Sequence, residues 1–263
     1  MHHWMPDVYD GSGIFGTLVL GTISKVTALI LLVRFTFYLW PTMLLNVESY
    51  YFAFISFAIA SLLLGMFHNL YQQNLKRIIA YSSITQMGYI IIAFSLGTYH
   101  STILAIFMSA LYLINVLGFF MVMCSLHYIH NGRTFTNLRE VGAMTNETLV
   151  SFMVALLLLN FAGIPPVFSF VLKFDLIASL VTSDSIFGLS LAFIVLTVST
   201  ISMFYYLRII RMIHAEAEFR PVSDVLTTVS PVTAFIFFMI IIINLSLLVY
   251  PDFLVRLIAE VVI

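Results

Sequence analysis

Long apolar stretches separated by short polar segments dominate the pattern along this chain. About 20 consecutive apolar residues are enough for a helix to cross the hydrocarbon core of a membrane. The stretches that reach or exceed this length are residues 14–39, 49–68, 77–97, 101–128, 148–181, 187–212 and 232–250. The pattern therefore predicts an all-α integral membrane protein, a single domain over residues 1–263 with about seven transmembrane helices.

The stretch 148–181 differs from the others because it is longer and contains Gly163-Ile164-Pro165-Pro166 near its middle. Proline removes a backbone donor and clashes with the preceding turn, so the stretch is either one broken helix or two crossings. Loop charge separates these alternatives, because positively charged loops stay on the side from which a chain inserts. With one crossing, one side of the membrane receives Lys76, Arg77, Arg133, Arg139, Arg208, Arg211 and Arg220, and the other receives Arg34 and Arg256.

Two crossings would remove this asymmetry, so we expect one helix that is broken near Gly163–Pro166. The N-terminus then faces the matrix or the cytoplasm, and the C-terminus faces the opposite side.

Composition supports a membrane protein and argues against several other classes. The chain is 62% hydrophobic and 9% charged, whereas soluble domains carry roughly 25% charged residues. A net charge of −1 without a basic patch argues against nucleic acid as a partner, which leaves membrane lipids. The single cysteine, Cys124, excludes an internal disulfide, and the sequence has no phosphate-binding loop and no Cys/His cluster. We expect no metal and no redox cofactor in this chain.

Two lysines lie inside predicted spans, where cations are rare. Lys25 is midway along the first span, and Lys173 follows the second proline of the broken span by seven residues. A lysine at the bilayer centre costs about 2.5–3.5 kcal/mol on insertion scales. Because burial disfavours the charged form, such a lysine can exchange a proton. The hydroxyls of Ser24 and Thr27 beside Lys25, and of Ser169 one turn before Lys173, are candidates for holding water.

Structural explanations remain open for each of these lysines. Lys25 can extend its side chain to the membrane interface. Lys173 can have a structural role, although Asp175 is an unsuitable partner because residues two apart do not face each other on a helix. Lys76, at the start of a span, is either a proton-relay residue or an ordinary topology determinant, and the sequence favours neither.

Aromatic and histidine residues at the span ends fit an interfacial position. The pair Tyr205-Tyr206, followed by Arg208, reads as an aromatic anchor. The same interpretation applies to the histidines His68, His100, His127 and His130.

Several short motifs follow one another in a characteristic order along the chain. In order, these are His3–Gly11, Ser24-Lys25, Asn74–Ser83, Gln86–Tyr89, Ala162–Pro166 with Phe170 and Lys173, and Tyr205–Arg208. Together they resemble the antiporter-like subunits of respiratory complex I, NADH:ubiquinone oxidoreductase. The form of Pro6–Tyr9 is similar to NADH dehydrogenase subunit 2 rather than to subunits 4 or 5.

The resemblance implies a fold of fourteen helices in two inverted halves along a hydrophilic axis. Lys25 then matches the lysine of the eighth helix, which connects two half-channels. Lys173 matches the lysine of the broken twelfth helix, and Lys76 matches the start of the tenth helix on the matrix side. The spans of this chain correspond to the eighth to fourteenth helices.

The function implied by the resemblance is proton translocation by a non-redox subunit of the complex I membrane arm. NADH, FMN, iron–sulfur clusters and ubiquinone belong to other subunits. The expected partners are other membrane-arm subunits and a separate chain that supplies the first seven helices, which makes this chain the C-terminal half of a split subunit.

The expected location is the mitochondrial inner membrane, with the N-terminus in the matrix and the C-terminus on the intermembrane side. Two alternatives remain: a structural scaffold of the same arm that does not pump, and a subunit of a cation/proton antiporter complex.

Overall fold

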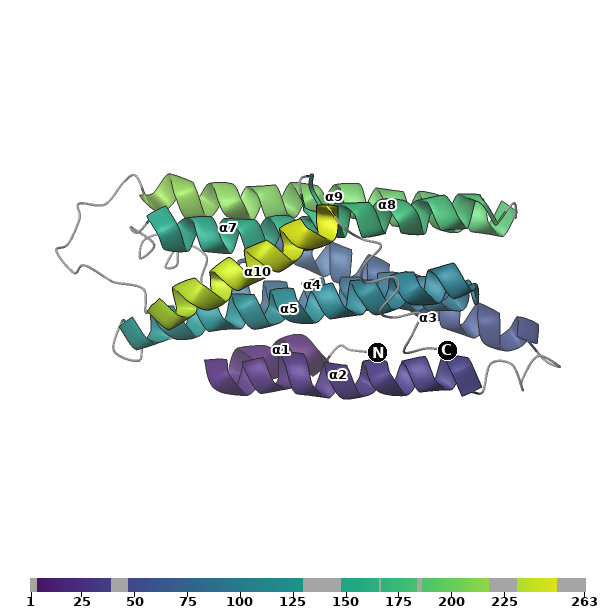
Figure 1. Ribbon diagram of the computed structural model, residues 1–263, viewed down its shortest axis with the longest axis horizontal. Coiled ribbons are helices and arrows are strands. Elements are labelled where there is room, and N and C mark those ends of the chain that lie inside the picture. Colours follow the sequence, from purple (N-terminus) through teal and green to yellow (C-terminus); the bar gives the residue numbers. More distant parts are fainter. Residues whose placement is uncertain are drawn as a thin grey trace.

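The computed structural model describes residues 4–38, 47–129, 148–165, 167–183, 186–217 and 231–249. These residues form an elongated helical bundle (Figure 1). In chain order the helices are α1 Trp4–Gly11, α2 Ile14–Tyr38, α3 Val47–Tyr71, α4 Leu75–Ser95, α5 Tyr99–Ile129, α7 Thr148–Ala162, α8 Phe168–Val181, α9 Ile186–Ala217 and α10 Pro231–Val249.

The predicted fold class and the predicted broken span are confirmed. Each predicted span corresponds to one helix, except that residues 148–181 form the two helices α7 and α8. Among the described residues, 5 helices are long and apolar enough to cross a membrane. The protein is therefore an all-α integral membrane protein.

The short helix α1 was not predicted from the sequence. It buries Met5, Pro6 and Tyr9, and it packs mainly against α4 with a smaller contact to α2. Met5 and Tyr9 are four residues apart and share one helix face, which gives α1 a small apolar stripe. A search for membrane-length stretches does not detect an eight-residue helix of this kind.

Helices α4 and α5 form the centre of the bundle. In the most apolar stretch of α4, 78% of the residues are buried inside the protein, and in α5 the share is 72%, against 28% for α2 and 33% for α9. Figure 1 shows α1 and α2 on one side of this centre, α7, α8 and α9 on the other, and α10 crossing obliquely. Side chains on α4 and α5 therefore face both flanking layers, and residues there can connect them.

Glycines allow α3 and α4 to approach each other closely. A Cβ added at Gly65 of α3 would lie 2.7 Å from Thr85 Cγ2 and 2.9 Å from the Tyr81 carbonyl oxygen. A Cβ added at Gly88 of α4 would lie 2.7 Å from Leu62 Cγ. Small residues are the usual means by which membrane helices come into backbone contact. This contact fixes the position of α4.

Replacing Gly65 by leucine should destabilise the bundle. The new side chain overlaps the α4 backbone, and overpacking of this kind costs about 1–3 kcal/mol. The expected result is a lower midpoint of thermal unfolding in detergent. Gly13→Ala is the matched control, because no atom lies within 4 Å of a Cβ built at Gly13. An unchanged midpoint for Gly65→Leu would show that the two helices are not in close contact.

Candidate functional site

Lys25 points from α2 into the bundle. Its side chain is buried, with a relative exposure of 5%, and its ammonium donates a hydrogen bond to the Tyr112 hydroxyl of α5. The Nζ atom also lies 4.8 Å from the ring centroid of Tyr112 and 5.8 Å from that of Tyr9, positions at which an aromatic face attracts a cation. The interfacial alternative for Lys25 is therefore wrong.

The expected role of Ser24 and Thr27 beside Lys25 is also wrong. Both residues are exposed, and their hydroxyls donate to backbone carbonyls of α2 itself. Neighbours in sequence face different sides of a helix, so neither lies beside the Lys25 ammonium. The partner that sequence reasoning missed is Tyr112, a residue 87 positions further along the chain.

Lys173 binds the backbone at the break between α7 and α8. It is 6% exposed, and its Nζ donates to the carbonyl oxygens of Phe161, at 3.0 Å, and Ala162, at 2.9 Å. In an uninterrupted α-helix these carbonyls would accept the N–H groups four residues later, at positions 165 and 166. Both positions are proline, which has no N–H. The Lys173 ammonium takes the place of the missing donors.

Glycine is required at position 163 beside this lysine. Its φ of 70° lies in the left-handed region, where glycine meets no steric penalty. A Cβ there would lie 2.9 Å from Lys173 Cδ and 3.0 Å from its Nζ. Gly163 thus permits both the turn and the close approach of the ammonium.

Two further side chains satisfy the backbone at the break. Ser169 Oγ donates to the Asn160 carbonyl oxygen at 2.6 Å, and Gln86 Nε2 donates to the Phe161 carbonyl oxygen at 3.1 Å. The predicted proximity of Ser169 to the Lys173 site is confirmed. Gln86, which comes from the central helix α4, begins one of the motifs noted in the sequence, and its role at this site was not predicted.

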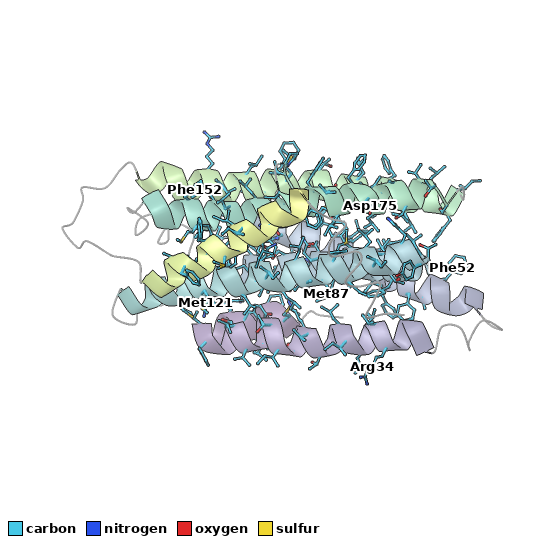
Figure 2. The ribbon with its side chains drawn as sticks, viewed as in Figure 1. Arg34, Phe52, Met87, Met121, Phe152 and Asp175 are labelled. Atoms are coloured by element: carbon cyan, nitrogen blue, oxygen red, sulfur yellow. The ribbon has the colours of Figure 1, made fainter. Side chains whose placement is uncertain are left out.

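Asp175 does not pair with Lys173, as expected from their spacing. Its carboxylate lies 3.5 Å from His100 Nε2, and the side chains of His100 and Asp175 are 66% and 40% exposed; Figure 2 labels Asp175 on α8. The ion pairs within the described part of the chain involve neither Lys25 nor Lys173. The two buried ammonium groups are held by a hydroxyl, by carbonyls and by aromatic faces.

A small cavity with a mixed polar and apolar lining lies between Lys173 and the tyrosine that binds Lys25. Its volume is about 20 Å³, and Tyr112, the partner of Lys25, and Lys173 both line it. The other lining residues are Gln86, Met108, Leu111, Asn115, Asn160, Phe161, Ser169 and Leu172. A cavity of at least about 10–15 Å³ accommodates one water molecule.

Two buried acceptors at this cavity favour a water molecule inside it. The side-chain oxygens of Asn115 and Asn160 are buried and have no hydrogen-bond partner among the described residues. An unsatisfied buried polar group costs about 1–3 kcal/mol, which a bound water would offset. The arrangement can therefore link Lys25, Tyr112, one water and Lys173 by hydrogen bonds.

Lys76 lies elsewhere, at the start of α4. Its Nζ donates to the Ser12 carbonyl oxygen at 2.7 Å. Next to it, Arg77 Nε and Asn74 Nδ2 hold the Asp10 carboxylate at 2.9 Å and 2.6 Å. These contacts fasten α1 and the link after it onto α4. The geometry gives Lys76 a structural role, and its role as a relay residue stays a prediction.

The interfacial interpretation of Tyr205 and Tyr206 is wrong. Their relative exposures are 3% and 1%, and Tyr206 stacks on Phe161 with ring centroids 6.2 Å apart. The hydropathy pattern cannot separate a lipid-facing from a protein-facing tyrosine near a helix end. Of the predicted interfacial histidines, His100 is exposed and His68 stacks on Tyr81. His130 and the His127 side chain lie outside the described residues.

Fold and site together define a class: a helical membrane protein with two buried lysines, one of which lines a small cavity beside a broken helix. The chain belongs to the NADH:quinone oxidoreductase/Mrp antiporter transmembrane family, whose profile matches residues 1–202.

Curated relatives in this family include bacterial NADH-quinone oxidoreductase subunit N proteins. The protein of Pelagibacter ubique is 33% identical over 218 residues, which cover 82% of this chain and 45% of the relative. That of Parvibaculum lavamentivorans is 33% identical over 235 residues, covering 87% of this chain and 47% of the relative. This chain thus spans about half the length of the relatives it matches.

Solved structures share the fold at lower identity. The membrane-bound sulfane sulfur reductase, an archaeal respiratory membrane complex, matches with a TM-score of 0.80 at 22% identity, over 98% of this chain and 50% of that chain. Respiratory complex I from Thermus thermophilus matches with a TM-score of 0.71 at 22% identity, over 95% and 52%. The Mrp complex from Dietzia matches with a TM-score of 0.68 at 21% identity, over 80% and 38%.

Replacing Asp10 by alanine should loosen α1, because its carboxylate holds Arg77 and Asn74 and is 27% exposed. Hydrogen bonds to charged groups contribute about 1.5–3 kcal/mol each, so we expect faster hydrogen–deuterium exchange of the α1 amides. Asp7→Ala is the control: Asp7 also pairs with Arg77, at 3.4 Å, but is 76% exposed, and exposed pairs contribute at most about 1 kcal/mol. Equal exchange in both variants would show that the Asp10 carboxylate does not hold α1 on α4.

Proposed function

We propose that this chain is the proton-translocating part of an antiporter-like subunit in the membrane arm of respiratory complex I. The observation that supports it best is the continuous arrangement of Lys25, Tyr112, the cavity and Lys173 inside the bundle. Ionisable residues at membrane depth mark ion pathways and proton relays. Two lysines on either side of Tyr112 and the cavity, with no carboxylate paired to them among the described residues, fit such a relay.

The proposed transfer moves one proton between the two amines. The Lys25 ammonium releases a proton to the Tyr112 hydroxyl and becomes neutral, while that hydroxyl passes its own proton to the water in the cavity. The water in turn protonates the neutral amine of Lys173. The carbonyls of Phe161 and Ala162 accept hydrogen bonds from Lys173, which stabilises its charged form.

Neighbouring charges provide the driving force for release. Two like charges 4 Å apart interact by about 4 kcal/mol at an effective dielectric constant of 20. A charge that arrives next to a protonated buried lysine therefore favours loss of its proton. Quinone reduction elsewhere in the complex would supply such charge movements.

The proposal assigns no redox chemistry to this chain. The named relatives are subunits of NADH-quinone oxidoreductase, and we infer that NADH, FMN, iron–sulfur clusters and ubiquinone are bound by other subunits. The assignment to subunit 2, the neighbouring membrane-arm subunits and a separate chain for the remaining half of the fold are parts of the same proposal. The mitochondrial inner membrane and the orientation of the termini also stay predictions, since the relatives named above are bacterial.

A second candidate is a subunit of a cation/proton antiporter complex. The family includes Mrp antiporters, and the Dietzia Mrp complex has a similar fold. Purification of the native assembly separates the two candidates. Complex I requires NADH-oxidising, iron–sulfur subunits in the same particle, and an antiporter complex lacks them.

Replacing either buried lysine by methionine should slow proton transfer through this chain without preventing assembly. Loss of a positioned acid–base group typically slows proton transfer about 10²–10⁴-fold. The measurement is protons translocated per NADH oxidised by the assembled complex in vesicles, with assembly followed by native electrophoresis. Arg34→Met is the control, because Arg34 is exposed and points away from the bundle (Figure 2). An unchanged ratio in both lysine variants would favour a scaffold without pumping.

Tyr112→Phe should weaken the relay while keeping the aromatic face beside Lys25. A lost hydrogen bond to a charged group costs about 1.5–3 kcal/mol, which corresponds to a roughly 10- to 160-fold slower step. The rate of proton uptake in a single turnover measures this step. Tyr99→Phe at the exposed start of the same helix is the control. Identical rates in the two variants would show that the Tyr112 hydroxyl is not part of the pathway.

A further inference from the structure

Two arginines near the end of α9 have no role in the relay proposed above. Arg208 and Arg211 are both exposed, and because they lie three residues apart they are neighbours on one face of the helix. Arginine is effectively always protonated in proteins. No carboxylate of the described residues lies within ion-pair distance of either guanidinium. This part of the surface therefore carries two positive charges without a counter-charge from the described part of the chain.

Arg208 is held in place by the neighbouring helix α3. Its Nη1 donates a hydrogen bond to the carbonyl oxygen of Leu70, in the last turn of α3, at 3.4 Å. A guanidinium has five N–H donors, so this bond leaves four of them for other acceptors. Because one side of the group is already held, it loses less conformational freedom when it binds a second acceptor. The guanidinium is thus positioned to receive a ligand with several oxygen atoms.

The two arginines lie where the membrane-spanning parts of α3 and α9 end. The apolar span of α3 ends at Tyr71, and that of α9 ends at Ile213. The bond between Arg208 and Leu70 places these ends beside each other, and the polar residues 72–74 follow α3 directly. Basic residues flank membrane spans at this level, and aromatic residues lie there among the lipid headgroups. The arginines are therefore at the level of the headgroups.

Apolar side chains lead away from the arginines along both helices. Helices α3 and α9 also touch near their first turns, where the rings of Phe52 and Phe187 lie 5.6 Å apart, so the two helices run side by side. Phe204 is 71% exposed and precedes Arg208 by about one helical turn, and Phe67 of α3 is 55% exposed. The α3–α9 face is defined here as the exposed residues Leu63, Phe67 and Tyr71 of α3 with Phe204, Arg208 and Arg211 of α9.

We propose that the α3–α9 face binds an anionic phospholipid, whose phosphate lies on Arg208 and Arg211 and whose acyl chains lie along Phe67 and Phe204. This inference does not depend on the proposed function. Guanidinium groups bind phosphate oxygens through two parallel hydrogen bonds, and the apolar side chains suit hydrocarbon. Positive charge at the membrane boundary with an apolar surface below it complements the order of groups in such a lipid.

A headgroup with net negative charge fits this face better than a zwitterionic one. Phosphatidylcholine carries a quaternary ammonium beside its phosphate, and that ammonium would lie close to the same two arginines. Like charges repel, which offsets part of the gain from the phosphate. The headgroup of phosphatidylglycerol carries the phosphate charge alone. Each basic residue near the membrane surface strengthens the binding of anionic lipid about fivefold.

The test measures lipid binding to the full chain purified in detergent. Native mass spectrometry follows the first bound phosphatidylglycerol during a titration, and phosphatidylcholine with the same acyl chains is the matched neutral lipid. We expect the wild type to bind phosphatidylglycerol more tightly. Arg208→Gln and Arg211→Gln should each weaken this binding about fivefold, and the double variant about 25-fold. The affinity for phosphatidylcholine should stay the same in all three variants.

Arg34→Gln is the matched control. It also removes one exposed arginine, but from α2, which lies on the opposite side of the bundle from α9 (Figure 1). This variant should bind phosphatidylglycerol as the wild type does. Thermal unfolding provides a second measurement, because a ligand that binds only the folded state stabilises it. Phosphatidylglycerol should raise the unfolding midpoint of the wild type and of Arg34→Gln, and not that of the double variant.

Three results would overturn the lipid site. Equal affinities of the wild type for the two lipids would exclude a preference for anionic lipid. An equal loss in Arg34→Gln would reduce the effect to net charge. Loss of a neighbouring subunit from the native assembly of the double variant, with unchanged lipid affinity, would make the α3–α9 face a protein interface. None of these results bears on proton transfer, so the lysine variants test the proposed function separately.

Discussion

The bond between the Lys173 ammonium and two backbone carbonyls is the interaction on which the site depends. Prolines at positions 165 and 166 leave the carbonyls of Phe161 and Ala162 without helical donors, and unsatisfied backbone groups at membrane depth cost several kcal/mol each. An isolated ammonium there is also unfavourable. The ammonium supplies the donors that the two carbonyls lack, and the carbonyls supply the acceptors that the buried ammonium needs. The break in the helix and the buried cation are thus a single feature, and Gly163 provides the space that both need.

The helices around this feature serve to bring it beside other polar groups. The central helix α5 carries Tyr112, which binds Lys25 on one side and lines the cavity at Lys173 on the other. The central helix α4 carries Gln86, which bonds the broken helix, and Tyr89, whose ring lies beneath the Lys173 ammonium. Helix α4 is held in place by its close contact with α3 at Gly65 and Gly88. The bond between Asp10 of α1 and Arg77 holds it on the other side. Helices α4 and α5 therefore carry both the contacts that hold the bundle together and the contacts at the candidate site.

The sequence predicted what depends on local pattern. The length of the apolar stretches predicted the spans, and the pair of prolines predicted the break in one of them. Positive charge inside a span pointed to Lys25 and Lys173. It did not predict Tyr112, Asn115 or Asn160, because these meet the lysines only through packing between distant segments. Ser24 and Thr27 were misassigned for the related reason that adjacency along a helix is not adjacency in space. Tyr205 and Tyr206 were misplaced because an apolar helix gives no sign of which face meets lipid.

The small size of the cavity has a consequence for energy conservation. A membrane that stores a proton gradient must not leak, and a wide aqueous pore through this bundle would discharge the gradient continuously. The space of about 20 Å³ between Tyr112 and Lys173 has room for roughly a single molecule of water. In the proposed relay, that molecule would be the one link between the two side chains, so proton transfer would depend on its presence.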